Sequence, residues 1–328
     1  MNYNTPVLFL IFNRPDLTEI VFNKIKEIRP YHLFIAADGP RDVQEKELCE
    51  KTRRLVLDNI DWECKTETLI RDHNLGCKIA VSSAIDWFFS KADMGIILED
   101  DCLPDTSFFT FCQEMLQKYK DDERVMHICG SNYTMGLTKD IPESYYFSKY
   151  AEMWGWATWK RAWLMYELEM KSYDNFEKEN RIKDVFENKR VQRFWSSVFT
   201  NHLTNQLDTW DFQWIYSVLK NYGLCIVPMN NLISNIGCGI GATHIADSKY
   251  KVANQTVKSI NTIMHPSFVL PNNKFDLIHL ENRFLYKKRM SYVLKTFFVK
   301  VIKIIVSQRL YTVFRGKRIL NPINKNSK

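Results

Sequence analysis

Short apolar runs alternate with helical patterns over the first third of the chain. Apolar runs lie at residues 7–12, 33–37 and 95–98, a further strand is expected at 66–70, and each of these segments ends in polar or turn-forming residues. Between them, apolar residues recur at helical spacing from Pro15 to Pro30, over 43–59 and over 78–90. Strands that alternate with helices predict an α/β fold with a mainly parallel sheet flanked by helices. Ligands of such sheets bind beyond the carboxyl ends of the strands.

The second half of the chain is less regular. It holds an aromatic stretch at 153–163, a polar helical region at about 174–205, a helix that opens at Trp210 and ends near Gly223, a strand at 224–227 and a glycine-rich loop at 235–244. No repeat of fixed period and no long linker divides it from the first half. The pattern therefore predicts one domain over residues 1–282, followed by a tail at 283–328.

Charge separates the same two parts. The whole chain has a net charge of +7 and a hydrophobic share of 45%, which is ordinary for a globular protein and excludes disordered, collagen-like and disulfide-stapled classes. No acidic residue follows Glu281, and residues 283–328 contain 13 Lys and Arg, so residues 1–282 carry a net charge of −6. A slightly acidic body therefore precedes a strongly basic tail.

The tail contains a basic amphipathic helical pattern. Residues 293–306 are apolar except for Lys295 and a stripe of Thr296, Lys300 and Lys303 at helical spacing. This run is too short to span a bilayer, but it suits a helix that lies on an anionic membrane surface through residues 283–318. A helix that packs on the main domain or on a dimer partner is the alternative. Nucleic acid is not an expected partner, since no nucleic-acid recognition motif accompanies the charge.

The cysteines and the first residues indicate a reducing compartment. None of the eight cysteines belongs to a C-x-x-C pair, so we expect reduced thiols rather than zinc ligands or disulfides. The apolar run at 7–12 is too short for a signal peptide and lacks a basic start. We therefore expect a cytoplasmic protein, bound peripherally to the inner face of the cell membrane through its tail.

The sharpest chemical feature is Glu99-Asp100-Asp101, directly after the apolar strand at 95–98. Three adjacent carboxylates repel one another unless a cation binds them, and such hard oxygen ligands suit Mg²⁺ or Mn²⁺ held together with a substrate's phosphates. The alternative is a solvated strand end in which aspartate forms a turn. The place of the triplet, at the end of a buried strand in an α/β sheet, favours a ligand site.

This segment resembles the GT-A fold glycosyltransferases, which use nucleotide sugars. The resemblance is greatest to the N-acetylglucosaminyltransferase group, whose variant of the Asp-x-Asp motif is Glu-Asp-Asp. Leu103-Pro104-Asp105 and Phe108-Phe109 follow the motif here as they tend to do in that family. The resemblance covers about residues 5–250. It implies a Rossmann-like sheet, with a nucleotide-binding half at about 1–130 and an acceptor half at about 131–282.

The resemblance also implies roles for residues at the strand ends. Asp101 would bind the metal directly, and Glu99 and Asp100 would face the donor. The further donor-site residues are Asn13, Arg14, Asp38, Arg71 and Asn74, with Asn13 standing where the family has aspartate. For Arg14, Asp38 and Arg71, a structural ion pair or a turn cap is the alternative to ligand contact.

Trp210-Asp211 resembles the family's Trp-Asp pair before a helix, in which the carboxylate is the general base of inverting enzymes. One base suffices for an inverting transfer, because it need only remove the proton of the acceptor hydroxyl. A helix N-cap is the alternative role for Asp211. The chain departs from the family directly afterwards, where Phe212 stands in place of a second acid.

His244 follows Gly237, Gly239 and Gly241 in a loop that is able to approach a phosphate closely. The resemblance implies a contact between His244 and the metal or the diphosphate. A loop histidine that hydrogen-bonds its own backbone is the alternative.

Trp154, Gly155 and Trp156 belong to the stretch that the resemblance places beside the donor sugar and the acceptor. A flat aromatic face packs well against the apolar face of a sugar ring, which favours a sugar pocket here. Tryptophans at such spacing are otherwise most often core residues.

Together these residues predict a metal-dependent, inverting glycosyltransferase. It would move a sugar from a UDP-sugar or a related nucleotide diphosphate sugar to a hydroxyl of a glycan or lipid-linked glycan, with Mn²⁺ or Mg²⁺ as cofactor. The membrane-seeking tail suits surface polysaccharide or lipopolysaccharide assembly in bacteria. One rival is a sugar nucleotidyltransferase, although Phe12-Asn13-Arg14-Pro15 lacks the glycines of its loop. The other is a non-catalytic, membrane-associated glycan-binding protein with the same fold.

Overall fold

The computed structural model describes residues 3–134, 136, 141–237 and 254–285. It has two units, Met1–His279 and Leu280–Lys328. The predicted role of His244 and the predicted amphipathic tail lie outside the described residues, so both stay predictions, as does the domain boundary after residue 282. The described part of the second unit consists of the last residue of α10 (Asn273–Leu280) and a π-helical turn at Glu281–Leu285.

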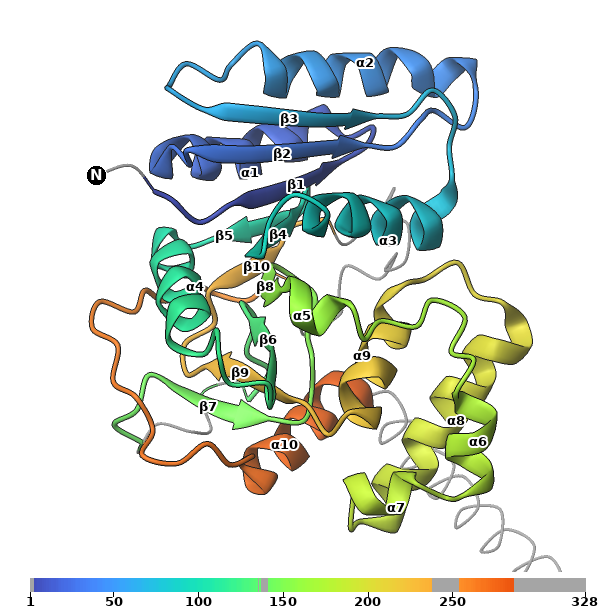
Figure 1. Ribbon diagram of the computed structural model, residues 1–328. Coiled ribbons are helices and arrows are strands. Elements are labelled where there is room, and N and C mark those ends of the chain that lie inside the picture. The colour runs from blue at the N-terminus through green and yellow to red at the C-terminus, as the bar shows by residue number, and fades with distance from the viewer. Residues whose placement is uncertain (1–2, 135, 137–140, 238–253, 286–328) are drawn as a thin grey trace, which may run out of the picture. The chain divides into compact units, whose positions relative to one another are not determined.

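Strands and helices alternate along the first third of the chain (Figure 1). In chain order the elements are β1 (Val7–Ile11), α1 (Pro15–Ile28), β2 (His32–Ala37), α2 (Val43–Leu57), β3 (Lys65–Ile70), α3 (Gly76–Phe89) and β4 (Met94–Glu99). Each of these elements was predicted, with ends that agree to within about two residues.

The elements that follow vary more in length, from three to 17 residues. They are β5 (Cys102–Pro104), α4 (Thr106–Lys118), β6 (Val125–Cys129), β7 (Tyr145–Ser148), β8 (Trp156–Trp159), α5 (Lys160–Trp163), α6 (Tyr173–Lys178), α7 (Ile182–Val185), α8 (Lys189–Asn205), α9 (Asp211–Lys220), β9 (Leu224–Pro228) and β10 (Ile233–Asn235). The polar helical region expected at 174–205 is divided into α6, α7 and α8. Strands β5, β6, β7, β8 and β10 were not predicted.

Among the described residues, an eight-stranded sheet organises the first unit, with the strand order β3-β2-β1-β4-β8-β6-β9-β7. The strands β3, β2, β1 and β4 are parallel. β8 runs antiparallel to both neighbours, β6 and β9 are parallel, and β7 is an antiparallel edge strand. The predicted α/β class, with a mainly parallel sheet flanked by helices, is confirmed.

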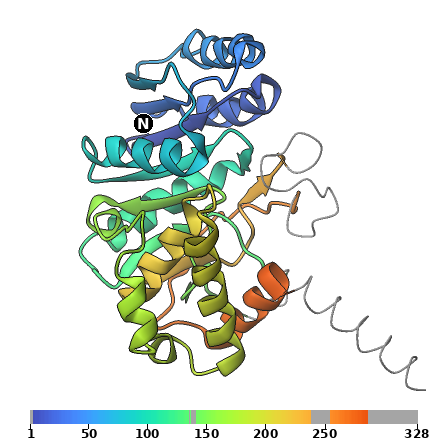
Figure 2. The ribbon, with the colours of Figure 1, turned by 90° about the vertical axis from the view of Figure 1, so that its right-hand side faces the viewer.

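Helices cover both faces of the parallel part of the sheet, and Figure 2 shows α1 and α3 on opposite sides of the strands. On one face, Phe9 of β1 stacks on Phe22 of α1, with ring centroids 6.3 Å apart. On the other face, Phe34 of β2 meets Phe88 of α3 edge to face at 4.8 Å. Successive side chains of a strand point to opposite faces of the sheet. Because helices cover both faces, every residue of β1 is buried.

The parallel register brings several strand ends to one edge of the sheet. Ile11 of β1 pairs with Ala37 of β2, and Ala37 pairs with Ile70 of β3. Leu10 of β1 pairs with Glu99 of β4. The segments that follow these strands, at residues 12–14, 38–39, 71–75 and 100–101, therefore all start at the same edge.

Two further observations bear on the sequence analysis. Within the described ranges, no helix has both the length and the apolar character needed to cross a membrane. The described cysteines are free thiols, and all except Cys64 and Cys77 are buried.

Candidate active site

Arg14 and the carboxylates that follow β4 form the centre of the candidate site. Arg14, the N-cap of α1, donates from Nη2 both to Oδ1 of Asp100 and to Oδ2 of Asp101, the second at 3.0 Å. Asp100 is 3% exposed, whereas the side chain of Asp101 is 17% exposed. Oδ2 of Asp100 is buried and has no hydrogen-bond partner in the described part of the chain. One guanidinium thus forms ion pairs with two adjacent carboxylates.

The neighbouring carboxylates oppose one another's ionisation. Burial raises the pKa of Glu99, and the charges of Asp101 and Asp100 raise it further. Burial also raises the pKa of Asp100, although Arg14 acts in the opposite direction. A bound cation would favour the ionised forms and lower both pKa values. The positive charge of Arg14 therefore does not balance the negative charges of these carboxylates when all are ionised.

The strand pair of β5 and β10 brings a glycine against this centre. Nδ2 of Asn235 donates to Oδ1 of Asp101 at 3.2 Å, and the backbone N–H of Ile236 donates to the carbonyl of Asp101 at 2.9 Å. A Cβ atom on Gly237 would clash with the carboxylate of Asp101 and come within 2.8 Å of Arg14. The glycine-rich loop predicted at 235–244 therefore starts beside the carboxylates.

Asp38, directly after β2, anchors the loop that follows β3. Its carboxylate accepts hydrogen bonds from the backbone N–H groups of Gly39 at 2.9 Å and Leu75 at 3.1 Å, and from Nδ2 of Asn74 at 2.9 Å. Burial raises the pKa of Asp38, although the N–H donors act in the opposite direction. The structure thus brings Asp38 and Asn74 together, and their contact with a nucleotide stays a prediction.

Arg71 and Asn13 are directed toward protein groups. Arg71 donates to Oγ of Ser83 at 2.7 Å and to the carbonyl of Ala80 at 3.2 Å, both on α3. Asn13 donates to Glu45, in the first turn of α2, at 2.8 Å. For Arg71 these contacts favour the structural alternative, in which its guanidinium ties the loop after β3 to α3.

Asp208 links the loop before α9 to the N-terminus of α3, and the sequence analysis missed it. Its carboxylate accepts hydrogen bonds from the backbone N–H groups of Cys77 at 3.0 Å and Lys78 at 2.8 Å. These N–H groups have no partner inside the helix, and a negative charge suits the positive end of the helix dipole. The contact spans 131 residues of sequence, so no local pattern could have revealed it.

Asp211 is the first residue of α9, and its charge acts on the pKa values of Glu99 and Cys77. The N-cap of α9 is Trp210, so Asp211 does not hold the N-cap position that was its alternative role. Burial raises the pKa of the Cys77 thiol, and four carboxylates raise it further. These belong to Glu99, Asp211, Asp208 and Asp38. Asp211 also raises the pKa of Glu99. The negative charges of Asp38, Glu99, Asp208 and Asp211 therefore all disfavour the Cys77 thiolate.

Trp154, Gly155 and Trp156 differ in their surroundings. Trp156 is fully buried and stacks on Trp210 with ring centroids 5.7 Å apart, which favours the core interpretation. Gly155 has φ +58°, and a Cβ atom there would clash with Ile233 of β10. Trp154 is partly exposed. A sugar contact stays a prediction. Of the three residues, only Trp154 has a partly exposed side chain that a sugar could reach.

The donor set of the centre suits a hard divalent cation. Asp100 and Asp101 offer carboxylate oxygens, one of them buried without a partner among the described residues. In the same part of the chain, no three or more His, Cys, Asp or Glu side chains are arranged to hold a metal ion by themselves. Mg²⁺ is commonly held by one or two carboxylates together with substrate phosphates. The residues present fit such a shared site.

Comparison with known proteins gives only partial similarities. No family model and no curated protein matches the chain. Among solved structures, TarS from S. aureus has a TM-score of 0.39 and 10% identity over 70% of this chain and 59% of that chain. HddC from Yersinia pseudotuberculosis has a TM-score of 0.29 and 11% identity over 48% of this chain and 77% of that chain. The 4-diphosphocytidyl-2C-methyl-D-erythritol synthase from Anaerococcus prevotii has a TM-score of 0.31 and 6% identity over 54% of this chain and 78% of that chain. Similarity at this level assigns the chain to no family.

Replacement of Asp208 by alanine should lower the free energy of unfolding by about 1 kcal/mol, because two N–H groups at the start of α3 lose their acceptor. Asp208→Asn keeps one acceptor oxygen and should cost less. Denaturant unfolding measures both. Asp174→Ala, an exposed aspartate in the first turn of α6, is the matched control and should change stability by less than about 0.5 kcal/mol. Equal losses in the two alanine variants would contradict the capping role.

Replacement of Arg14 by methionine should make stability more sensitive to pH in metal-free buffer. Without the guanidinium, the pKa of folded Asp100 rises further above its unfolded value, so the folded state binds more protons than the unfolded state. Stability then falls as pH rises from the unfolded pKa of about 4 through the folded pKa, by about 1.4 kcal/mol for each additional unit of pKa.

Denaturant unfolding at a series of pH values in EDTA measures this dependence. Arg124→Met, which removes a surface arginine paired with Asp122, is the matched control. The same change of stability with pH in Arg14→Met and in the unmodified protein would show that Arg14 does not stabilise the ionised form of Asp100.

Proposed function

We propose that the chain transfers a sugar from a nucleotide diphosphate sugar to a hydroxyl of a glycan or glycolipid. The observation that best supports this proposal is the group of Glu99, Asp100 and Asp101, to which Arg14 supplies a single positive charge. Such a group suits a divalent cation that carries a diphosphate. It also lies at the sheet edge where ligands of parallel sheets bind.

The donor would lie across the ends of β1, β2 and β4. Asp100 and Asp101 would hold Mn²⁺ or Mg²⁺, which when bound neutralises the departing diphosphate. Arg14, at the start of α1, would place a further positive charge beside the same phosphates. Asp38 and Asn74 would contact the ribose or the base from the neighbouring strand ends. A UDP-sugar is the donor that the family resemblance favours.

Asp211 would remove the proton from the acceptor hydroxyl. The hydrogen bonds of Asp208 to α3 fix the loop that leads into α9, and so support the position of Asp211. A single base on the side opposite the leaving diphosphate gives inversion at the sugar carbon. Since Phe212 stands where related enzymes have a second acid, Asp211 would act alone.

The rival function of nucleotidyl transfer has less support. Only Phe12, Asn13 and Arg14 lie between β1 and α1. A nucleotidyltransferase of this fold would need a glycine-rich loop here, whose N–H groups surround the phosphates of a nucleoside triphosphate. A lipid-linked acceptor and attachment to an anionic membrane rest on the basic tail alone, which lies outside the described residues.

Nucleotide release from a panel of UDP-, GDP- and dTDP-sugars, with Mn²⁺ or with EDTA, tests the proposal. We expect turnover of one donor class, and only with metal. Asp101→Asn should lose both turnover and metal-dependent donor binding. Asp211→Asn should lose turnover by about 10²- to 10⁴-fold and still bind the donor.

Asp122→Asn is the matched control, because its carboxylate pairs with Arg124 at the surface, just before β6 and at the sheet edge opposite the carboxyl end of β4. It should behave as the unmodified protein. Neither binding nor turnover of any donor by the unmodified protein would overturn the proposal. An unchanged rate in Asp211→Asn would remove that residue from the role of base.

A further inference from the structure

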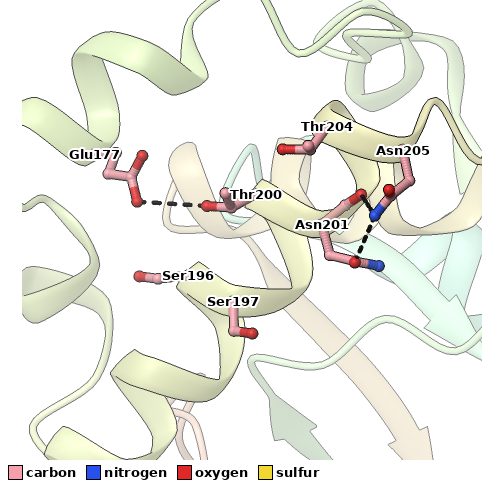
Figure 3. Close-up of a pocket in the computed structure, with 7 residues that line it drawn as sticks. All are labelled: Glu177, Ser196, Ser197, Thr200, Asn201, Thr204 and Asn205. Atoms are coloured by element: carbon pink, nitrogen blue, oxygen red, sulfur yellow. Dashed lines mark hydrogen bonds between the residues drawn. The ribbon is translucent and has the colours of Figure 1, made fainter.

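A second site candidate is an open groove between α6 and α8 (Figure 3). Its volume is about 440 Å³, and it is lined by Glu177 of α6 and by one face of α8 from Ser196 to Asn205. The lining side chains of α8 come in neighbouring pairs that are spaced four residues apart, so they lie along one stripe of the helix. In Figure 3, Ser196 and Thr200 lie on the side of α8 toward Glu177, and a hydrogen bond joins Thr200 to Glu177. None of them belongs to the candidate active site.

The chemistry of the lining is uniform. Apart from Glu177, every lining side chain carries a hydroxyl or a carboxamide. Hydroxyls and carboxamides both donate and accept hydrogen bonds, and a carboxylate accepts them. Among the residues that the structure describes, no lysine, arginine or large apolar side chain lines the groove. The lining therefore matches a neutral ligand rich in hydroxyls, and it matches neither a phosphate nor an acyl chain.

The groove is held in shape by hydrogen bonds beneath and across it. The hydroxyl of buried Tyr173 lies 3.1 Å from the carbonyl of Ser196 and 3.2 Å from Oγ1 of Thr200. Thr200 also donates to Oε1 of Glu177 at 3.4 Å. The ring of Tyr173 packs edge to face on that of Phe199, 5.8 Å away. Polar groups with such support keep their positions without a ligand, which lowers the entropy lost on binding.

The chain connects this groove to the candidate active site. α8 ends at Asn205, and the next residues form the loop in which Asp208 binds the N-terminus of α3. The same loop leads into Asp211 at the start of α9. The C-terminal end of the groove is therefore three residues from Asp208.

We propose that this groove binds neutral sugar units of the acceptor glycan, beyond the unit that receives the transferred sugar. The inference rests on the proposed function, because it assigns the acceptor of that reaction to a carbohydrate longer than one sugar. Hydroxyls of the bound sugars would exchange hydrogen bonds with Thr200 and Asn201, near the middle of the groove, and Glu177 would accept hydrogen bonds from the other side.

Binding of defined oligosaccharides to the full chain tests this inference. The probes are maltohexaose, chitohexaose and mannohexaose as neutral glycans, and a heparin hexasaccharide as an anionic one, each titrated by calorimetry. We expect at least one neutral probe to bind in the millimolar range or more tightly. The double variant Thr200→Val and Asn201→Leu keeps the shape of the groove but removes its central polar groups, and should weaken that binding about tenfold.

The matched control is the double variant Thr110→Val and Asn59→Leu, which makes the same two replacements at exposed positions of other elements. It should bind the probe as the unmodified protein does. The inference is overturned if no neutral probe binds, if the heparin hexasaccharide binds in preference, or if the groove variant binds as well as the control.

Donor turnover, measured in the same three proteins, separates this inference from the proposed function. Normal turnover together with unchanged glycan binding in the groove variant would overturn the groove alone. Absence of turnover in all three proteins would overturn the proposed function. A tenfold loss of binding that appears only in the groove variant would then still support a sugar site on α8.

Discussion

The ion pairs of Arg14 with Asp100 and Asp101 hold like charges together at the end of a buried strand, and the candidate site depends on them. Two unit charges about 4 Å apart repel by about 4 kcal/mol at the effective dielectric constant of a protein surface. A single guanidinium opposes that repulsion, and Glu99 adds a further carboxylate beside the pair. A bound cation would offset the remaining negative charge, as the proposed function requires. The register of β1 against β4 places Arg14 and the carboxylates at one edge, since Leu10 pairs with Glu99.

The second half of the chain contributes further residues to this edge of the sheet. The pairing of β10 with β5 brings Asn235 and Gly237 against Asp101. Asp208 fixes the loop before α9 to the start of α3, and Asp211 follows it. Hydrogen bonds thus join the segment of Asn235 to Asp101, and the loop before α9 to the start of α3. A change in the loop at 206–210 would be expected to move Asp211 relative to α3.

The sequence was sufficient for the parallel part of the sheet, because β1 and the strands beside it are short apolar runs that end in polar residues. It also located the strand-end residues Asp38, Asn74 and Asp100, which the structure brings to one edge. It did not predict β6, β7 and β8, which lie among aromatic residues and show no alternation, nor the antiparallel direction of β8. The direction of a strand depends on contacts between distant segments of the chain. The same holds for the hydrogen bonds of Asp208 and for the groove on α8. Trp156 belongs to an aromatic core, which is the alternative that its spacing had left open.

Binding of Mn²⁺ to the full chain, followed by electron paramagnetic resonance with and without nucleoside diphosphates, tests most directly whether the strand-end carboxylates form a shared cation site. The account predicts that, with one nucleoside diphosphate, protein and nucleotide together bind far more Mn²⁺ than the sum of what each binds alone, because the phosphates supply the ligands that the protein lacks. Bound Mn²⁺ that equals the sum of the protein-only and nucleotide-only values for every nucleoside diphosphate would contradict it.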